Sequence, residues 1–115
     1  MTFDTVALCR DEPGPPAILG ALIAAGSDLK IDTDESAGLI QLFDPLDGRL
    51  LLTVETTRLV QVPGEVERLL GVSCDVPVWW VESRSPSGDT QAAETARRFS
   101  AELVAITGGQ TWAGR

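Results

Sequence analysis

Residues 37–55 read AGLIQLFDPLDGRLLLTVE, and they place two apolar runs on either side of a turn sequence. The turn runs from Asp44 to Gly48, where proline fixes one backbone angle and Asp-Gly favours a chain reversal. The flanking runs, 37–43 and 49–55, are therefore predicted to pair as a β-hairpin. Because a hairpin joins antiparallel strands, it favours an antiparallel sheet over a doubly wound parallel one.

The segments on both sides of this hairpin alternate between strand-like and helix-like patterns. We expect strands at residues 5–9, 37–43, 49–55, 57–62 and 76–82, helices at 15–25, 63–71 and 90–107, and a short strand or docked tail at 110–112. A bend near Thr56 or Thr57 should separate the third and fourth strands. The predicted fold is α+β, in the order β-α-β-β-(β)-α-β-α-(β), with an antiparallel sheet of four or five strands and helices packed mainly on one face.

Two of the predicted helices carry an apolar row. In 15–25 the apolar residues recur at i, i+1, i+4 and i+5, so they are predicted to share one face. These residues are Ile18, Leu19, Leu22 and Ile23. In 90–107 the apolar residues recur at spacings of four and three, which is the strongest helical signal in the chain. This row consists of Ala92, Ala96, Phe99, Leu103 and Ile106, and it should bury Phe99 and Leu103 while Arg97, Arg98 and Glu102 face solvent.

Composition limits what the chain can be. Of its 115 residues 43% are apolar and 23% charged, and 17 acidic against 9 basic residues give a net charge of −8. A chain of this size and apolar content is predicted to fold as one compact domain, residues 1–115, without metal or disulfide staples. The acidic balance disfavours nucleic-acid binding. Histidine and tyrosine are absent from the sequence, which excludes imidazole bases, histidine-ligated metals and phenolic acids.

The cysteines and the N-terminus point to a reducing compartment. Cys9 and Cys74 fit no CxxC or zinc-binding spacing, so buried reduced thiols are expected, with a disulfide as the alternative. The first cationic residue is Arg10, so the N-terminus lacks the basic region of a secretory signal. The longest strongly apolar stretch, Ala17 to Ala25, is too short to span a bilayer. We therefore expect a cytoplasmic protein with no membrane partner.

Familiar motifs for cofactor, metal and acyl-transfer chemistry are absent or fail on spacing. The sequence contains no GxGxxG, GxxxxGK[ST] or GxSxG pattern. The segment starting at Asp32 opens like an EF-hand loop, but Ala37 and Phe43 occupy the positions that need glycine and glutamate. We expect no cofactor, no metal and no catalytic nucleophile.

Glu82 is the carboxylate in the most suggestive place. It follows Trp80 and Val81 on a predicted strand, where burial would raise its pKa and suit it to acid–base chemistry. The competing interpretation places Glu82 at the strand end, paired with Arg84 or with an arginine of the last helix. The structural role is favoured.

Adjacent tryptophans and an acidic segment are the candidate partner-binding residues. Trp79 and Trp80 must point to opposite faces of a strand, so one is expected in the core and the other outside it, where a large ring could anchor a partner. The segment 28–35 is predicted to be a solvated loop that could also face a basic partner or bind a cation weakly. Its acidic residues are Asp28, Asp32, Asp34 and Glu35. Residues 1–50 carry a net charge of −6 and residues 51–115 only −2, so the N-terminal half dominates the electrostatic field.

Three stretches carry a resemblance to other proteins. Residues 59–71, residues 76–82 with their Trp-Trp pair, and the closing Gly108-Gly109-Gln110-Thr111-Trp112 are similar to small uncharacterised actinobacterial proteins. The resemblance covers about half of the chain. It implies no activity, cofactor or catalytic residue.

Two classes of function follow from these patterns. The first is a non-enzymatic acidic protein-interaction module, such as an accessory, chaperone-like or immunity-type factor, whose partner is another protein or a second copy of the chain. The second is a small-molecule-binding or carboxylate-based enzymatic domain that uses Glu82. A deep pocket around Glu82 would favour the second, and an exposed strip centred on a tryptophan would favour the first.

Overall fold

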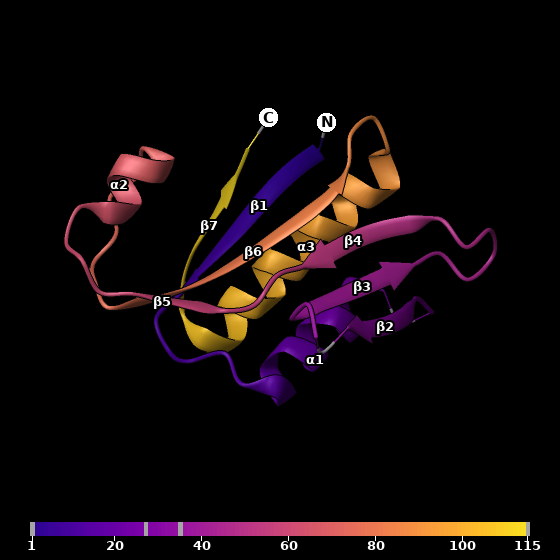
Figure 1. The fold of residues 1–115 in the computed structure, drawn as a ribbon, viewed down its shortest axis with the longest axis horizontal. Coiled ribbons are helices and arrows are strands. Elements are labelled where there is room, and N and C mark those ends of the chain that lie inside the picture. Colours follow the sequence, from indigo (N-terminus) through magenta and orange to yellow (C-terminus); the bar gives the residue numbers. More distant parts are fainter. Residues whose placement is uncertain (1, 27, 35, 115) are drawn as a thin grey trace.

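The computed structural model describes residues 2–26, 28–34 and 36–114, which form one seven-stranded antiparallel sheet with three helices (Figure 1). The elements are β1 Thr2–Cys9, α1 Pro15–Ala25, β2 Lys30–Asp34, β3 Leu39–Phe43, β4 Leu50–Val54, β5 Arg58–Val60, α2 Glu65–Leu70, β6 Val78–Pro86, α3 Thr90–Thr107 and β7 Gly109–Ala113. The predicted α+β class and antiparallel sheet are confirmed. The sheet has seven strands instead of the four or five expected.

The strands lie in the order β2-β3-β4-β6-β1-β7, and β5 pairs with β6 beyond the end of β4. The hairpin predicted from residues 37–55 is the β3–β4 pair. β4 and β5 both run along β6, and the chain between them is irregular, as the expected bend near Thr56 requires. Thr56 Oγ1 donates to the carbonyl of Gly38 over 2.8 Å, and a Cβ at position 38 would clash with that hydroxyl. A glycine with positive φ is therefore needed at position 38, where this hydrogen bond connects the residue before β3 to the bend.

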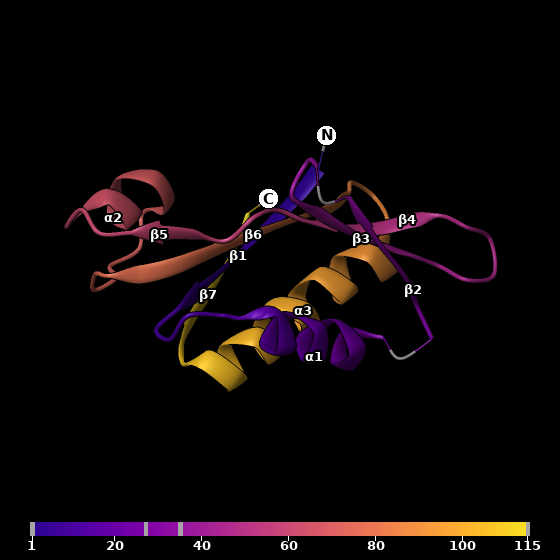
Figure 2. The same cartoon turned by 60° about the horizontal axis from the view of Figure 1, so that its bottom comes forward.

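Helices cover both faces of the sheet, but unequally. Figure 2 shows α1 and α3 together below the sheet and α2 above it at the β5 end. The core between the sheet and these two helices includes Ala7 of β1 and Val81 of β6. The neighbouring residues Leu8 and Trp80 point to the other face, where Val66 of α2 packs in a second core. The two longer helices thus lie on one face as predicted, and α2 adds a small core on the opposite face.

The acidic segment is not the predicted loop. Residues Lys30–Asp34 form β2, the outermost strand next to β3, and all five of its residues are exposed. The sequence signal is weak because only Ile31 and Thr33 have strand-forming side chains, and these alternate with Asp32 and Asp34. Carboxylates on an edge strand discourage pairing with other chains, which accounts for an acidic strand at this position. Glu35 lies outside the described residues.

Both long helices begin and end at the predicted residues. In α3, Phe99 and Leu103 are fully buried, and Arg97, Arg98 and Glu102 are exposed, which confirms the predicted orientation. Ile106, the last member of the predicted row, is 54% exposed.

In α1 the predicted single face is wrong. Leu22 is buried together with Ala21 and Ala25, whereas Leu19 and Ile23 are exposed. Residues 15–25 are apolar on every side, so their spacing does not define which side packs inward.

No helix within the described part of the chain is both long and apolar enough to cross a membrane.

Candidate functional site

The two adjacent tryptophans point to opposite faces of β6, as their alternation requires. Trp80 is only 4% exposed and packs in the second core, where its Nε1 donates to Glu82 Oε1 over 3.3 Å. The guanidinium of Arg58 lies 5.2 Å from the centre of the Trp80 ring. Trp79 packs against the core between the sheet and helices α1 and α3, and it is half-buried. The prediction that one tryptophan lies outside the core is wrong, because α2 supplies a second core that the sequence did not reveal.

Trp79 keeps some contact with solvent beside an exposed neighbour. Its partner across the β5–β6 pair is Leu59, whose side chain is 42% exposed. The third tryptophan, Trp112 of β7, donates from Nε1 to the carbonyl of Leu70 over 3.1 Å and so ties β7 to α2. None of these three rings offers a fully exposed anchor.

The acidic residues of the N-terminal half are spread along an edge. Asp28, Asp32 and Asp34 are all exposed. Asp34 Oδ1 accepts hydrogen bonds from Ser36 Oγ over 2.7 Å and from the Ala37 amide over 3.2 Å, and these bonds lower its pKa. Asp34 thereby ties Ser36 and Ala37 to the end of β2. The described residues contain no group of three or more side chains suited to hold a metal ion.

Glu82 belongs to an ion-pair network on the face of the sheet that carries α2. It lies in the middle of β6 and not at its end as expected, and its pairing with Arg84 is confirmed at 3.0 Å. Arg84 Nη2 is also 3.1 Å from Glu55 Oε2, in an orientation that makes an ion pair but no hydrogen bond. Burial, followed by the nearby charge of Glu82, raises the pKa of Glu55.

This network adjoins a hollow of about 330 Å³, lined also by Thr56 and Arg58. One guanidinium engages both carboxylates, so Arg84 and the indole of Trp80 already use the groups that would have to act on a substrate. The arrangement supports the structural interpretation of Glu82.

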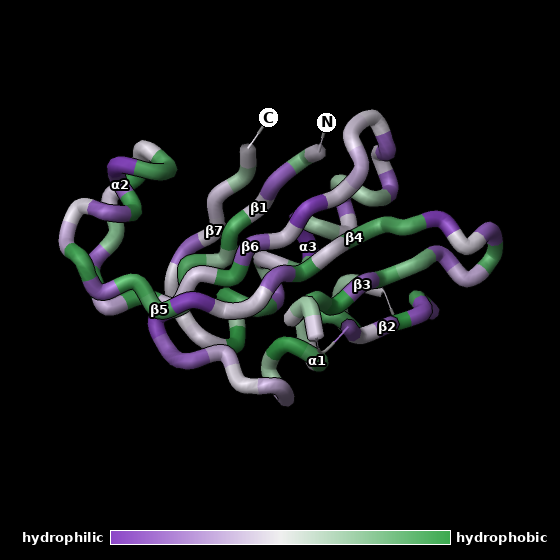
Figure 3. Tube along the Cα trace, in the orientation of Figure 1, coloured by the Kyte–Doolittle hydropathy of each residue, from purple (hydrophilic) through white to green (hydrophobic). Residues whose placement is uncertain are grey.

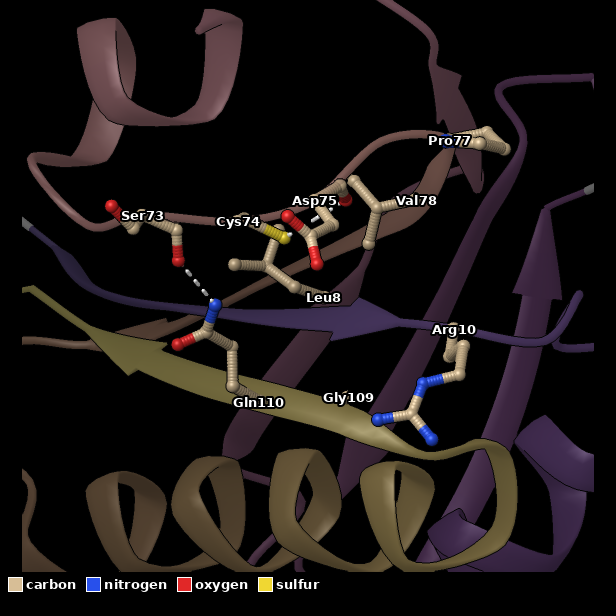
Figure 4. A pocket seen from close by; sticks show the side chains of 9 residues that line it. All are labelled: Leu8, Arg10, Ser73, Cys74, Asp75, Pro77, Val78, Gly109 and Gln110. Atoms are coloured by element: carbon tan, nitrogen blue, oxygen red, sulfur yellow. Dashed lines mark hydrogen bonds between the residues drawn. The ribbon is translucent and has the colours of Figure 1, made fainter. Parts of the chain in front are cut away.

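A larger hollow of about 560 Å³ lies where β1, β6 and β7 meet the loop 71–77 (Figure 4). Its apolar wall includes Leu8 and Val78, and its polar lining includes Arg10, Asp75 and Gln110. Sequence reasoning missed this site because the residues that line it come from three separate parts of the chain. In the sequence Arg10 stands out only as the first cation, and Asp75 carries no signal of its own.

Two features fix the shape of this hollow. Gln110 Nε2 donates to the carbonyl of Ser73 over 2.8 Å, which ties the loop to β7. The thiol of Cys74 donates to the carbonyl of Asp75 over 3.5 Å.

Cys9, in contrast, is completely buried, and burial raises the pKa of its thiol, as expected for a reduced structural cysteine.

An exposed apolar strip lies on the opposite side of the molecule from α2. Leu19 and Ile23, one helical turn apart on α1, are 49% and 52% exposed. Ile106 of α3 lies across from them, since its Cδ1 would be 3.8 Å from a Cβ placed on Gly20. We call Leu19, Ile23 and Ile106 the α1 strip. Figure 3 shows α1 as one of the most hydrophobic segments of the chain.

Comparison with protein-family models, with curated proteins and with solved structures found no match. The resemblance to small actinobacterial proteins therefore stays a prediction, and the geometry alone carries the functional argument.

Proposed function

We propose that this protein is a non-enzymatic interaction module that binds a partner protein through the α1 strip. The observation that carries the proposal is the composition of α1, which has no polar or charged side chain on any side although part of it faces solvent. A helix at the surface of a monomer ordinarily presents polar residues to water. An apolar outer face is typical of a helix that another surface covers.

The energetic gain from covering the strip is useful but modest. Fully burying a Leu or Ile side chain is worth about 1.5–3 kcal/mol, so covering a half-exposed one contributes roughly 1 kcal/mol. Leu19, Ile23 and Ile106 could thus form the apolar centre of a contact. Polar groups around them would supply the rest of the affinity and the specificity.

Charge favours a basic partner over a second copy of the chain. Exposed acidic residues flank α1 at both ends, with Asp11 and Glu12 before it and Asp28 after it. A second copy would bring the same net charge of −8 and the same flanking carboxylates. A protein with an apolar surface bordered by Lys or Arg would instead be attracted, mainly through a faster encounter.

Site-specific photocrosslinking in the native host tests this proposal. A benzophenone amino acid replaces Leu19 in one variant and Leu46 in the control, since Leu46 is 94% exposed in the β3–β4 turn and far more accessible. We expect an adduct of one defined mass from position 19 and none from position 46. The same adduct should weaken when Asp11 and Glu12 are replaced by Asn and Gln.

Two results would overturn the proposal. Position 19 yielding no adduct above the level of position 46 would show that nothing covers the strip. An adduct with twice the mass of the chain would identify the partner as a second copy and refute the argument from charge.

A further inference from the structure

We infer that the hollow of Figure 4 binds a small zwitterion, with its carboxylate at Arg10 and its ammonium group at Asp75. This site is separate from the α1 strip, and its test is independent of the proposed interaction function. The ligand class that the lining fits is a free amino acid or an ω-amino acid.

The hollow has the size of a small-molecule site. Its volume of about 560 Å³ lies within the usual range of roughly 300–1,000 Å³ for ligand pockets. Leu8 and Val78 border the hollow from the second core and are only 0% and 3% exposed. Because β1 and β6 hold these residues, this border is in place before any ligand arrives.

Arg10, an exposed residue, supplies the cation. Its amide donates to the carbonyl of Gly108 over 2.9 Å, which fixes the backbone directly after β1. A Cβ at Gly108 would lie 3.4 Å from Arg10 Nη1, so the guanidinium passes close over this glycine, where a larger side chain would crowd it. In the part of the chain that the structure describes, Arg10 joins none of the ion pairs. Its donors are therefore available to a carboxylate, which a guanidinium binds through two parallel hydrogen bonds.

Asp75 supplies the opposite charge from another wall. Figure 4 shows its carboxylate extending from the loop toward β1, while the guanidinium of Arg10 lies beside Gly109. The Gln110–Ser73 hydrogen bond anchors this loop to β7. Among residues 2–26, 28–34 and 36–114, no cation pairs with the Asp75 carboxylate.

The pairing of these charges selects the ligand class. A simple anion would meet Asp75 and the net charge of −8, and a simple cation would meet Arg10. A zwitterion satisfies both side chains and brings no net charge into the acidic field. The site would then distinguish between zwitterions by the distance between their two charges.

Protection of Cys74 from a thiol reagent provides the test. Cys74 lines the hollow and is partly exposed, whereas Cys9 is fully buried, so the fast reaction of the native chain with Ellman's reagent reports on Cys74. The probes are glycine, β-alanine, γ-aminobutyrate, δ-aminovalerate and leucine, with acetate and methylamine as singly charged controls. Calorimetric titration of the same probes gives a second readout that does not depend on the thiol.

We expect saturable protection by zwitterions, strongest at one spacing of the charges, and none from acetate or methylamine. Arg10→Gln and Asp75→Asn should each weaken binding by about tenfold or more, as for loss of a charge-assisted hydrogen bond. Asp28→Asn is the matched control, since this exposed carboxylate does not line the hollow, and it should bind as the unaltered protein does. Thermal melts confirm that each variant is folded.

The inference fails if no zwitterion of the series binds below about 10 mM in either readout. It also fails if Arg10→Gln and Asp75→Asn bind as tightly as Asp28→Asn. Either result leaves the photocrosslinking test of the α1 strip unaffected.

Discussion

α1 and α3 pack side by side on the same face of the sheet, yet their outer surfaces are opposite in character. α3 buries Phe99 and Leu103 and exposes Arg97, Arg98 and Glu102. α1 buries Leu22 and exposes Leu19 and Ile23, with no polar residue in between. Exposure to water accounts for the polar outer face of α3. It does not account for the apolar outer face of α1, and this difference is the reason to propose that a partner covers α1.

The inner faces of the two helices should nevertheless be equally important to stability. Both contribute to the same core, where α1 provides Ala21, Leu22 and Ala25 and α3 provides Ala96, Phe99 and Leu103. Alanine substitutions can therefore distinguish the residues that stabilise the monomer from those that are available to contact a partner.

The largest effect is expected at the centre of α3. Phe99→Ala removes a fully buried ring, so it should lower the free energy of unfolding by about 3–5 kcal/mol, through lost burial and the cavity left behind. Arg98→Ala, one residue earlier on the exposed side, should cost less than about 0.5 kcal/mol. Urea denaturation of both variants measures the contrast. Comparable losses would mean that α3 is rotated relative to the sheet.

A similar contrast should divide α1, and it distinguishes the observed face from the one the sequence suggested. Leu22→Ala should cost about 2–5 kcal/mol because the side chain is 1% exposed. Leu19→Ala, at a side chain 49% exposed, should cost less than about 1 kcal/mol. Denaturation curves of this leucine pair decide the point. If Leu19→Ala proved the more damaging, the outer face of α1 would be part of the core and unable to serve a partner.

The two helices also show how far sequence reasoning reaches. In α3, polar residues alternate with apolar ones, so the period itself identifies the buried side, and both its bounds and its orientation were predicted correctly. In α1 the proline start and the final glycine identify the bounds, but uniform apolarity leaves the rotation of the helix undetermined. The spacing of apolar residues identifies the buried side of a helix only where polar residues occupy the other side.

The candidate sites were harder to predict for a different reason. Arg10 and Asp75 line the same hollow because the end of β1 and the start of β6 are neighbours in the sheet, although the two residues are 65 positions apart in the chain. The second core that buries Trp80 depends likewise on where α2 lies, which its own short sequence does not specify. Pairings of this kind belong to the tertiary structure and leave no local signal.

The N-terminal ends of the helices differ as well, and the next expected effect is of intermediate size. Asp89 caps α3 by accepting a hydrogen bond from the Ala92 amide over 3.1 Å, and it pairs with Arg49 at 2.6 Å. Asp89→Ala should cost about 1 kcal/mol at pH 7, whereas Asp89→Asn should retain most of the cap. Thermal melts at matched pH compare the two variants.

The stabilisation by Asp89 should depend on pH in one direction. Hydrogen bonding by the Ala92 amide is the largest cause that lowers its pKa below the ordinary value of 3.8. The stabilisation is therefore complete above that value and is lost as the pH falls through the lower pKa of the folded state. The gap between the unaltered protein and Asp89→Ala should close in acid. A gap that widened below pH 4 would contradict the capping role.

The smallest effect is expected from giving α1 the cap that it lacks. Gly14 occupies the capping position with no side chain to accept a hydrogen bond, and its φ of −71° and ψ of 173° suit any residue. Pro15 and Pro16 have no amide hydrogen, so Ala17 has the first helical amide that a capping side chain could share, and this amide already donates to the carbonyl of Gly14 over 3.1 Å. A Cβ at position 14 would meet only Pro16 Cδ, at an ordinary 3.7 Å. Gly14→Ser should therefore stabilise the protein by about 0.5 kcal/mol, a rise of roughly 2–4 °C in Tm, because it adds the acceptor and restricts the unfolded chain. Gly14→Ala is the control, since it restricts the chain without adding an acceptor. If serine exceeds alanine, the missing cap is a weakness of α1 that α3 does not share; if serine gives no gain over alanine, the two prolines have already removed the need for a cap.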